Sequence, residues 1–248
     1  MPPKRDWNNF AQKFDKFAKR DDYPRRFAEK IRGTPCDTVL DLGCGNGSFA
    51  IEISKKVKHV TSVDIATKML EIAGKNAKNC NVTNITFIED RIEDLNPKKM
   101  GQYDIVVASR SLGVYNLKKE LKKIDELARK YVYITMWNPK RNQLEANFCD
   151  IMGLEYHQKP DYIYLYNMLY QLGIYANVEL FEEDSKLEYC NVEEAINRCM
   201  LRMGLKEDEM NEDTKFKLKN YLKTHFKEKN GDIYFPKGDK PIMIWWKK

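Results

Sequence analysis

Between residues 38 and 137, short apolar runs alternate with longer segments in which apolar residues recur every three or four positions. Short apolar runs predict buried strands, and the longer spacing predicts amphipathic helices. The expected strands are Thr38–Leu42, His59–Asp64, Ile85–Ile88, Tyr103–Ala108 and Tyr131–Trp137. The expected helices are Gly47–Lys56, Thr67–Asn79 and 117–127. This order predicts an α/β fold, a doubly wound and mostly parallel sheet with helices on both faces.

The segments that flank this region are richer in helical patterns. Aromatic residues at helical spacing predict a helix over 6–20 and a shorter one that ends before the breaker Gly33-Thr34-Pro35. Farther along, the pattern predicts a tyrosine-rich helix at 161–173, a sixth strand, two more helices and a seventh strand. The expected positions are 175–181 for the sixth strand, 190–230 for the two helices and 242–246 for the seventh strand.

Composition excludes several classes of protein. No apolar run approaches the roughly 18 residues that a membrane-spanning helix needs. The 6 cysteines and 3 histidines are scattered without a Cys-x-x-Cys pair, which argues against a zinc site and against a disulfide framework. The N-terminus lacks the apolar core of a signal peptide, so we expect a cytoplasmic protein without a bound metal.

The positive charge is concentrated near the N-terminus. The chain has a formal net charge of +6, and residues 1–32 contain 10 basic and 5 acidic residues. Such a segment can attract an anionic substrate or a nucleic acid. A solvated helix surface explains it more simply, because no basic block alternates with aromatic residues suited to stacking on bases. The sequence makes no prediction about the oligomeric state.

The most informative motif lies at the end of the first expected strand. Asp41 is followed by Gly43, Gly45 and Gly47 at every second position, and a helix pattern begins at once. Glycines permit a tight turn and let a ligand approach the backbone. The spacing differs from the dinucleotide fingerprint, which would require glycine where Ser48 stands. An acid before the glycines suits a ligand with a positive amino group.

A second acid ends the next expected strand. At the tip of that strand Asp64 is placed to accept hydrogen bonds from two ribose hydroxyls. Because ligands of open α/β sheets bind at the carboxyl ends of the strands, the loops after 88 and 108 should complete the site. The two motifs together predict a nucleoside site.

The pattern Asp-x-Gly-x-Gly-x-Gly resembles the first motif of class I S-adenosylmethionine-dependent methyltransferases. The resemblance implies S-adenosylmethionine as the cofactor and a Rossmann-like, seven-stranded sheet whose last strand is antiparallel. It also implies roles for the loops: the glycine loop at the methionine part, the second-strand acid at the ribose, the third loop at the adenine and the fourth below the sulfonium. The cofactor-binding residues expected on this basis are Asp41, Gly43, Cys44, Gly45, Gly47, Asp64, Ile65, Asp90, Arg91, Ile92 and Ser109.

The resemblance also implies a division of the chain. We expect N-terminal cap helices in 1–35 and a methyltransferase domain in 36–248, with a helical insertion at about 190–230 between the last two strands. The opening Trp-x-x-x-Ala-x-x-Phe-Asp, residues 7–15, is similar to the start of methyltransferases of quinone biosynthesis. A small-molecule acceptor under this helical cap is therefore the favoured function.

Other functions stay open at this stage. The chain could methylate RNA or protein through its basic N-terminal segment, bind the cofactor without catalysis, or, least favoured, use NAD. No triad or metal cluster is evident, and methyl transfer needs a base only when the acceptor must lose a proton. The candidate catalytic residues near the acceptor are Tyr23, Tyr115 and His157.

Overall fold

The computed structural model describes ten stretches of the chain: 6–19, 22–136, 141–156, 161–181, 185–189, 191–203, 210–225, 227–229, 232–239 and 241–248. Their packing divides them into two compact units. The sheet unit comprises Asp6–Met136, Ile163–Glu179 and Met243–Lys248. The insertion unit comprises the described residues of Trp137–Tyr162 and Leu180–Ile242.

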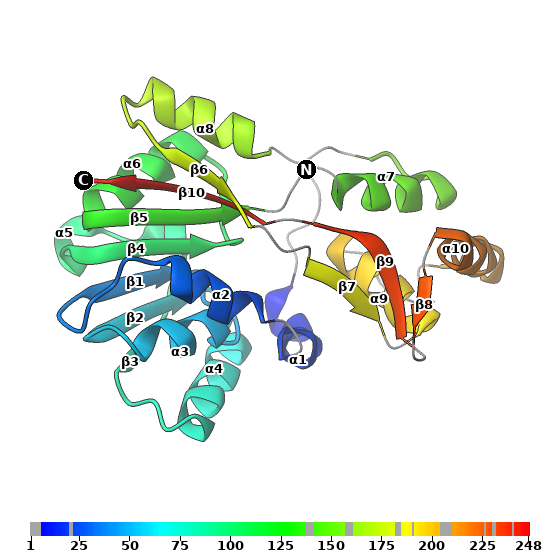
Figure 1. Ribbon diagram of the computed structural model, residues 1–248, viewed down its shortest axis with the longest axis horizontal. Helices are drawn as coiled ribbons and strands as arrows, with labels where there is room; N and C mark the ends of the chain where they lie inside the picture. Colours follow the sequence, from blue (N-terminus) through cyan, green and yellow to red (C-terminus); the bar gives the residue numbers. More distant parts are fainter. Residues whose placement is uncertain are drawn as a thin grey trace. The chain divides into compact units, whose positions relative to one another are not determined.

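A seven-stranded sheet with the order β3-β2-β1-β4-β5-β10-β6 organises the sheet unit (Figure 1). Its strands are β1 (Thr38–Leu42), β2 (His59–Asp64), β3 (Ile85–Glu89), β4 (Tyr103–Ser109), β5 (Ala128–Met136), β6 (Asn177–Leu180) and β10 (Ile242–Lys247). The pairs β1–β2, β1–β4, β2–β3 and β4–β5 are parallel. The predicted α/β fold with a mostly parallel sheet is confirmed.

The last strand runs against the others. The N–H of Lys248 donates to the carbonyl of Lys130 at 2.9 Å, so the end of β10 lies beside the beginning of β5. The ring of Trp245 also stacks on that of Tyr133, with centroids 6.1 Å apart. The expected antiparallel last strand is therefore present.

The helices of the sheet unit follow the predicted alternation. They are α1 (Trp7–Ala18), α2 (Tyr23–Lys30), α3 (Ser48–Ser54), α4 (Thr67–Asn79), the 3₁₀ helix η1 (Ile92–Asp94), α5 (Pro97–Met100), α6 (Leu117–Leu127) and α8 (Tyr162–Gln171). α1 packs on α4 and α2 packs on α3. The strands read as apolar runs because both faces are covered: Leu40, Val60, Val106 and Ile134 are fully buried.

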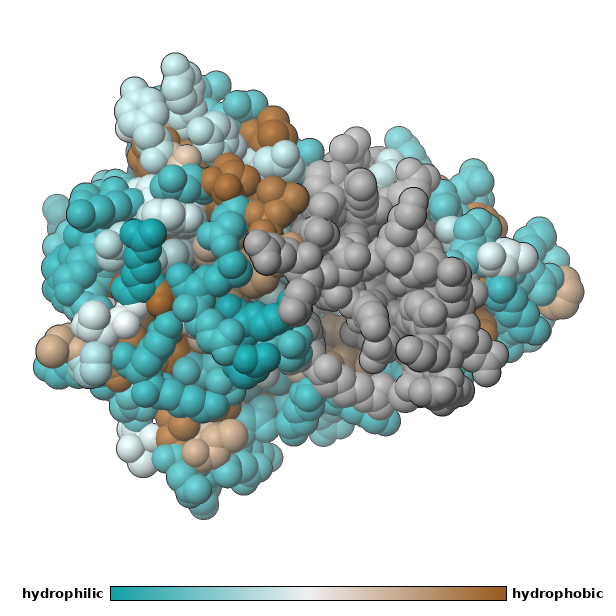
Figure 2. All heavy atoms as spheres, in the orientation of Figure 1, coloured by the Kyte–Doolittle hydropathy of each residue, from teal (hydrophilic) through white to brown (hydrophobic). Residues whose placement is uncertain are grey.

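The tyrosine-rich helix α8 buries its leucines. Leu165 and Leu169 are fully buried, whereas Tyr170 is exposed and Tyr166 is half-buried. Apolar side chains on α8 and on the neighbouring strand β6 also remain accessible, and Figure 2 shows hydrophobic colour in this region. The tyrosines flank the buried face of this helix, and its core contacts come from Leu165 and Leu169.

The insertion unit contains strands as well as helices. Its elements are α7 (Arg141–Ile151), β7 (Ser185–Tyr189), α9 (Val192–Met203), α10 (Glu212–His225), β8 (Lys227–Lys229) and β9 (Asp232–Asp239). The strands form an antiparallel sheet in the order β7-β9-β8. The helices share a core that includes Phe148, Ile196 and Leu222. The sequence predicted a helical insertion at about 190–230, and the structure shows that strands β7, β8 and β9 accompany the two helices α9 and α10 of this segment. Among the residues with a described structure, no helix is long and apolar enough to cross a membrane.

Candidate functional site

The loop that follows β1 turns through three glycines. Gly43, Gly45 and Gly47 have φ angles of +74°, +56° and +78°, which side chains with a Cβ rarely adopt. The N–H groups of Gly43 and Cys44 donate to the carbonyl of Val63 at 2.8 and 3.0 Å. This glycine loop (43–47) is thereby held against the end of β2.

Asp64 joins the glycine loop to the end of β2. Its Oδ2 accepts from the N–H of Gly45 at 2.8 Å, and its Oδ1 accepts from the N–H of Ala66 at 2.9 Å. Burial raises the pKa of Asp64 above its ordinary value, although these N–H donors oppose the shift. The side chain is half-buried, and the neighbouring Ile65 is exposed. Each carboxylate oxygen can accept a second hydrogen bond, so Asp64 can also bind ligand hydroxyls.

Asp41 lies under the loop as a buried carboxyl group. It is 1% exposed, and its Oδ2 has no hydrogen-bond partner within the described part of the chain. Burial, with a further contribution from the charge of Asp64, raises the pKa of Asp41 to about 8. A buried carboxyl without a partner is costly unless a ligand supplies one. Asp41 therefore fits a ligand that brings a donor or a positive charge.

We expect Asp41 to make the ligand-free protein less stable as pH rises. Its folded-state pKa lies above the unfolded value, so its stabilising contribution is complete below about pH 4 and is lost as pH rises towards about 8. Asp41→Asn should remove this slope and raise the free energy of unfolding at pH 8 by roughly 1–4 kcal/mol. Urea unfolding at pH 5 and pH 8 measures both quantities.

The matched control for this prediction is Asp94→Asn, because Asp94 is exposed. That variant should keep the wild-type pH slope. Carboxylates whose pKa is lowered, such as Asp37 and Asp104, affect the slope only at more acidic pH. An Asp41→Asn variant with the wild-type slope between pH 5 and pH 8 would contradict the assignment.

The loop after β3 is attached to the end of β2. The N–H of Asp90 donates to the carbonyl of Asp64 at 3.1 Å, and Oδ1 of Asp90 accepts from the N–H of Arg91 at 2.8 Å. The guanidinium of Arg91 lies 3.5 Å from carboxylate oxygens of Glu93 and Asp94. Ile92 begins η1 and is half-buried. The three residues predicted for this loop are thus placed at the same sheet edge as Asp64.

The loop after β4 contacts the glycine loop. A Cβ added to Gly43 would lie 2.4 Å from Cβ of Ser111, and the Ser111 hydroxyl donates to the carbonyl of Leu42. The carboxyl ends of β1 and β4 are therefore in direct contact. Sequence reasoning included Ser109 in the site and missed this role of Ser111.

An arginine and a tyrosine lie together at the end of β4. The Tyr23 hydroxyl is hydrogen-bonded to Oγ of Ser109 at 3.1 Å and also to the hydroxyl of Thr135. The guanidinium of Arg110 lies 3.7 Å from the centre of the Tyr23 ring. Arg110 has φ of +57°, an uncommon backbone conformation that is enriched at functional sites. Tyr23 was predicted for the acceptor side, whereas Arg110 was not.

Helix α1 covers the glycine loop through contacts that the expectation of N-terminal cap helices did not specify. The ring of Phe14 would lie 3.3 Å from a Cβ added to Gly45. Oδ1 of Asp15 accepts from the side-chain amides of Asn46 and Asn76, both at 2.9 Å. Burial opposes ionisation of Asp15, but these donors and Lys19 keep its pKa below the ordinary value. The available signal was the Phe-Asp pair that closes the N-terminal motif.

The other residues predicted for the site do not form one cluster. Tyr115 follows β4 and is 62% exposed. Cys44 is buried in the glycine loop, and burial raises the pKa of its thiol. His157 lies outside the described residues. Among the residues whose structure is described, no group of three ligating side chains could hold a metal ion.

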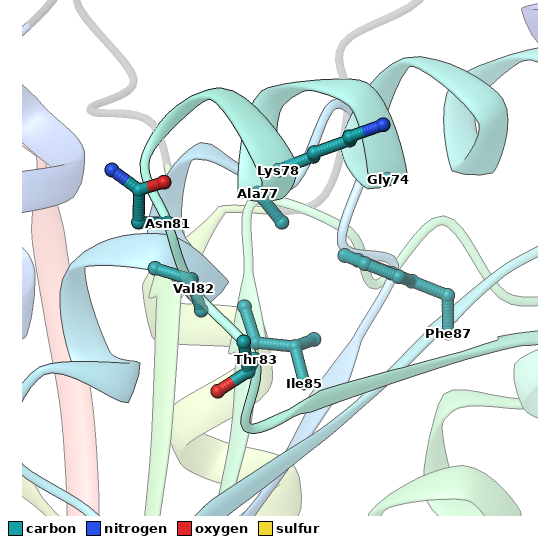
Figure 3. A pocket seen from close by; sticks show the side chains of 8 residues that line it. All are labelled: Gly74, Ala77, Lys78, Asn81, Val82, Thr83, Ile85 and Phe87. Carbon is teal, nitrogen blue, oxygen red and sulfur yellow. The ribbon is translucent and has the colours of Figure 1, made fainter.

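A hollow of about 450 Å³ lies away from these loops, between the end of α4 and β3 (Figure 3). Ala77, Val82, Ile85 and Phe87 supply apolar side chains, and Lys78 is its charged residue. Its floor is the beginning of β3, whereas Asp64 and the glycine loop lie at the carboxyl ends of their strands. This hollow is separate from the candidate site.

Comparison with known families gives a clear match. The family model described as "Methyltransferase domain" matches residues 34–171. An uncharacterised protein of Haemophilus influenzae is 28% identical over 224 residues, which are 90% of this chain and 81% of that protein. The ubiquinone biosynthesis O-methyltransferase of Vibrio campbellii is 36% identical over 84 residues, which are 34% of this chain and 35% of that enzyme.

Solved structures share the fold. The YcgJ protein of Bacillus subtilis has a TM-score of 0.62 at 15% identity, with 92% of this chain and 99% of that chain covered. Magnesium protoporphyrin IX methyltransferase of Synechocystis, solved with bound S-adenosylhomocysteine, has a TM-score of 0.53 at 20% identity. That match covers 65% of this chain and 75% of that chain.

Proposed function

Because the chain belongs to the class I S-adenosylmethionine-dependent methyltransferases, we propose that it transfers the methyl group of S-adenosylmethionine to a small-molecule acceptor. The cofactor supplies a methyl group that its sulfonium has already activated. The protein then has to bind the cofactor, orient the acceptor and exclude water. The observation that carries the proposal is the junction of the glycine loop, Asp41 and Asp64 at neighbouring strand ends.

The cofactor would be held by the three loops described above. Asp64 accepts hydrogen bonds from the ribose hydroxyls, and Ile65 covers the adenine. The loop of Asp90, Arg91 and Ile92 borders the adenine as well. Asp41 offsets the positive charge near the methionine part. Since the pKa of Asp41 is about 8 without a ligand, cofactor binding at pH 7 should release a proton as Asp41 ionises.

The acceptor side would be formed at the end of β4. The guanidinium of Arg110 lies over the Tyr23 ring, 3.7 Å from its centre, and brings a positive charge to this end of β4, which favours an acceptor with a carboxylate or a phosphate. Tyr23 is buried and its hydroxyl is already hydrogen-bonded. We therefore propose that Tyr23 orients the side chains of Ser109 and Arg110 and does not remove a proton from the acceptor. Tyr115 and His157 stay candidates for the acceptor side.

Two observations favour a small acceptor. Phe14 lies over Gly45, and α1 is attached to the glycine loop through Asp15, so α1 restricts access from that side. The matched relatives include a ubiquinone biosynthesis O-methyltransferase and a probable cobalt-precorrin-6B C(15)-methyltransferase, and both names refer to the metabolism of small molecules. A cap function for the insertion unit and a cytoplasmic location remain predictions.

The basic N-terminal segment gives less support to an RNA acceptor. Lys19, Arg25, Arg26 and Lys30 form ion pairs with acidic side chains. Local pairing weakens the field that a polyanion would encounter. If RNA were the acceptor, the protein should bind tRNA with an affinity that falls steeply with salt.

Incubation with methyl-labelled S-adenosylmethionine and a size-fractionated cell extract tests the proposal. We expect label in the small-molecule fraction, and Asp64→Ala should lose most of it at low cofactor concentration. Label confined to RNA or protein would overturn the small-molecule acceptor. Tight binding of S-adenosylhomocysteine without transfer to any fraction would indicate a cofactor-binding protein that does not catalyse the reaction.

A further inference from the structure

Helix α6 carries a buried ion pair beneath the loop that follows β3. The side chains of Lys123 and Glu120 are 10% and 2% exposed, and Nζ of Lys123 lies 2.7 Å from Oε2 of Glu120. Charged side chains are rarely buried unless they are paired and hydrogen-bonded. Neither residue was singled out by the sequence, because both resemble ordinary members of a lysine-rich amphipathic helix.

The ammonium group also caps the neighbouring 3₁₀ helix. Nζ of Lys123 donates to the carbonyl of Ile92 at 2.6 Å and to the carbonyl of Glu93 at 2.8 Å. Carbonyls at the end of a helix lack partners within it, and a cation there is favourable. The carboxylate of Glu120 adds a favourable charge contact to the same ammonium group.

Lys123 connects this loop to a rigid support. Leu121, Ile124 and Leu127 fix α6 in the core, since all three are fully buried. A hollow of about 440 Å³ separates part of the loop from α6, with Glu93, Leu95 and Lys122 among the residues that line it. Beside this hollow, Lys123 joins the backbone of the loop to α6 through hydrogen bonds from a buried side chain.

We infer that Lys123, oriented by Glu120, is a positioning residue that holds the loop 90–92 in the conformation that reads the adenine of the cofactor. This inference rests on the proposed function, in which the loop of Asp90 borders the adenine, and it places the Asp90 carboxylate beside the adenine amino group. Lys123 itself touches the backbone of the loop and has no part in the chemical step. Its loss should therefore reduce discrimination at the adenine rather than affinity for the rest of the cofactor.

The experiment compares two ligands by calorimetry: S-adenosylhomocysteine and its purine analogue, which lacks the adenine amino group. The wild type should prefer S-adenosylhomocysteine by roughly tenfold, because a site built to bind a polar group rejects an analogue without it. Lys123→Met should lower this preference to about twofold. Lys122→Met is the matched control, since Lys122 is exposed on the same helix, and it should keep the wild-type preference.

A second variant separates positioning from folding. Glu120→Leu/Lys123→Met replaces the whole buried pair with apolar side chains, which is often neutral for stability. It should regain the melting temperature that Lys123→Met loses, yet its preference should stay low. Equal losses for both ligands, or an unchanged preference in a folded variant, would overturn the inference. A wild type without preference would instead overturn the placement of Asp90, and the inference with it.

Discussion

Gly43→Ala should destabilise the protein by about 2–4 kcal/mol and abolish measurable cofactor binding. Two costs combine at this position. The φ of +74° is strained for alanine, and the new Cβ would lie 2.4 Å from Cβ of Ser111. Relief requires the glycine loop and the loop after β4 to separate, which displaces the groups around the cofactor. Urea unfolding and calorimetry with S-adenosylhomocysteine measure the two effects.

Gly173→Ala supplies the matched control. Gly173 follows α8 and has φ of +75°, but nothing lies within 4 Å of an added Cβ. That variant should lose only about 1–2 kcal/mol, the cost of the left-handed backbone, and bind cofactor normally. Ser111→Gly in the Gly43→Ala background should recover part of the lost stability. Equal losses for the Gly43 and Gly173 variants would show that the contact with Ser111 does not matter.

Asp64→Ala should weaken binding of S-adenosylhomocysteine by about 1–3 kcal/mol, or roughly 5- to 150-fold. The ribose hydroxyls would lose their acceptor, and the N–H groups of Gly45 and Ala66 would lose theirs. Asp64→Asn keeps one acceptor oxygen and should fall between the wild type and the alanine variant. Unchanged affinity in a folded Asp64→Ala variant would place the ribose elsewhere.

The sheet could be predicted because its signals are local. Five apolar runs, each followed by a polar loop, defined β1–β5 to within a few residues. The main error among them was the beginning of β5, where Ala128, Arg129 and Lys130 continue the strand directly from α6. Arg129 and Lys130 are charged and exposed near the beginning of β5, so this part of the strand shows no apolar pattern. Their position depends on pairing with β4, which the sequence does not state.

The insertion unit was harder to predict. β8 consists of Lys227, Glu228 and Lys229, and β9 includes Pro236 and Gly238. Neither segment has the alternation that marks a half-buried strand. β8 pairs with β9, and the other partner of β9, β7, lies about forty residues earlier in the chain. Strand pairing of this kind follows from tertiary structure, so the helical signals of α9 and α10 dominated the sequence pattern.

The residues of the candidate site also fall into two groups, those that the local sequence pattern predicted and those that it missed. Asp41, the glycines and Asp64 were found because each follows an apolar run at fixed spacing. Phe14 and Arg110 were missed because their roles depend on contacts with Gly45 and Tyr23, which lie far away in sequence. Local spacing therefore predicted the residues of the candidate site, and tertiary contacts were needed to see which side chains cover the glycine loop.

A crystal structure with S-adenosylhomocysteine tests the central claim most directly. We expect the ribose hydroxyls to donate hydrogen bonds to Asp64, the amino group of the homocysteine part to lie near Asp41, and the adenine to lie beside Asp90 and Ile92. Electron density for the ligand at another place, or none at a saturating concentration, would contradict it.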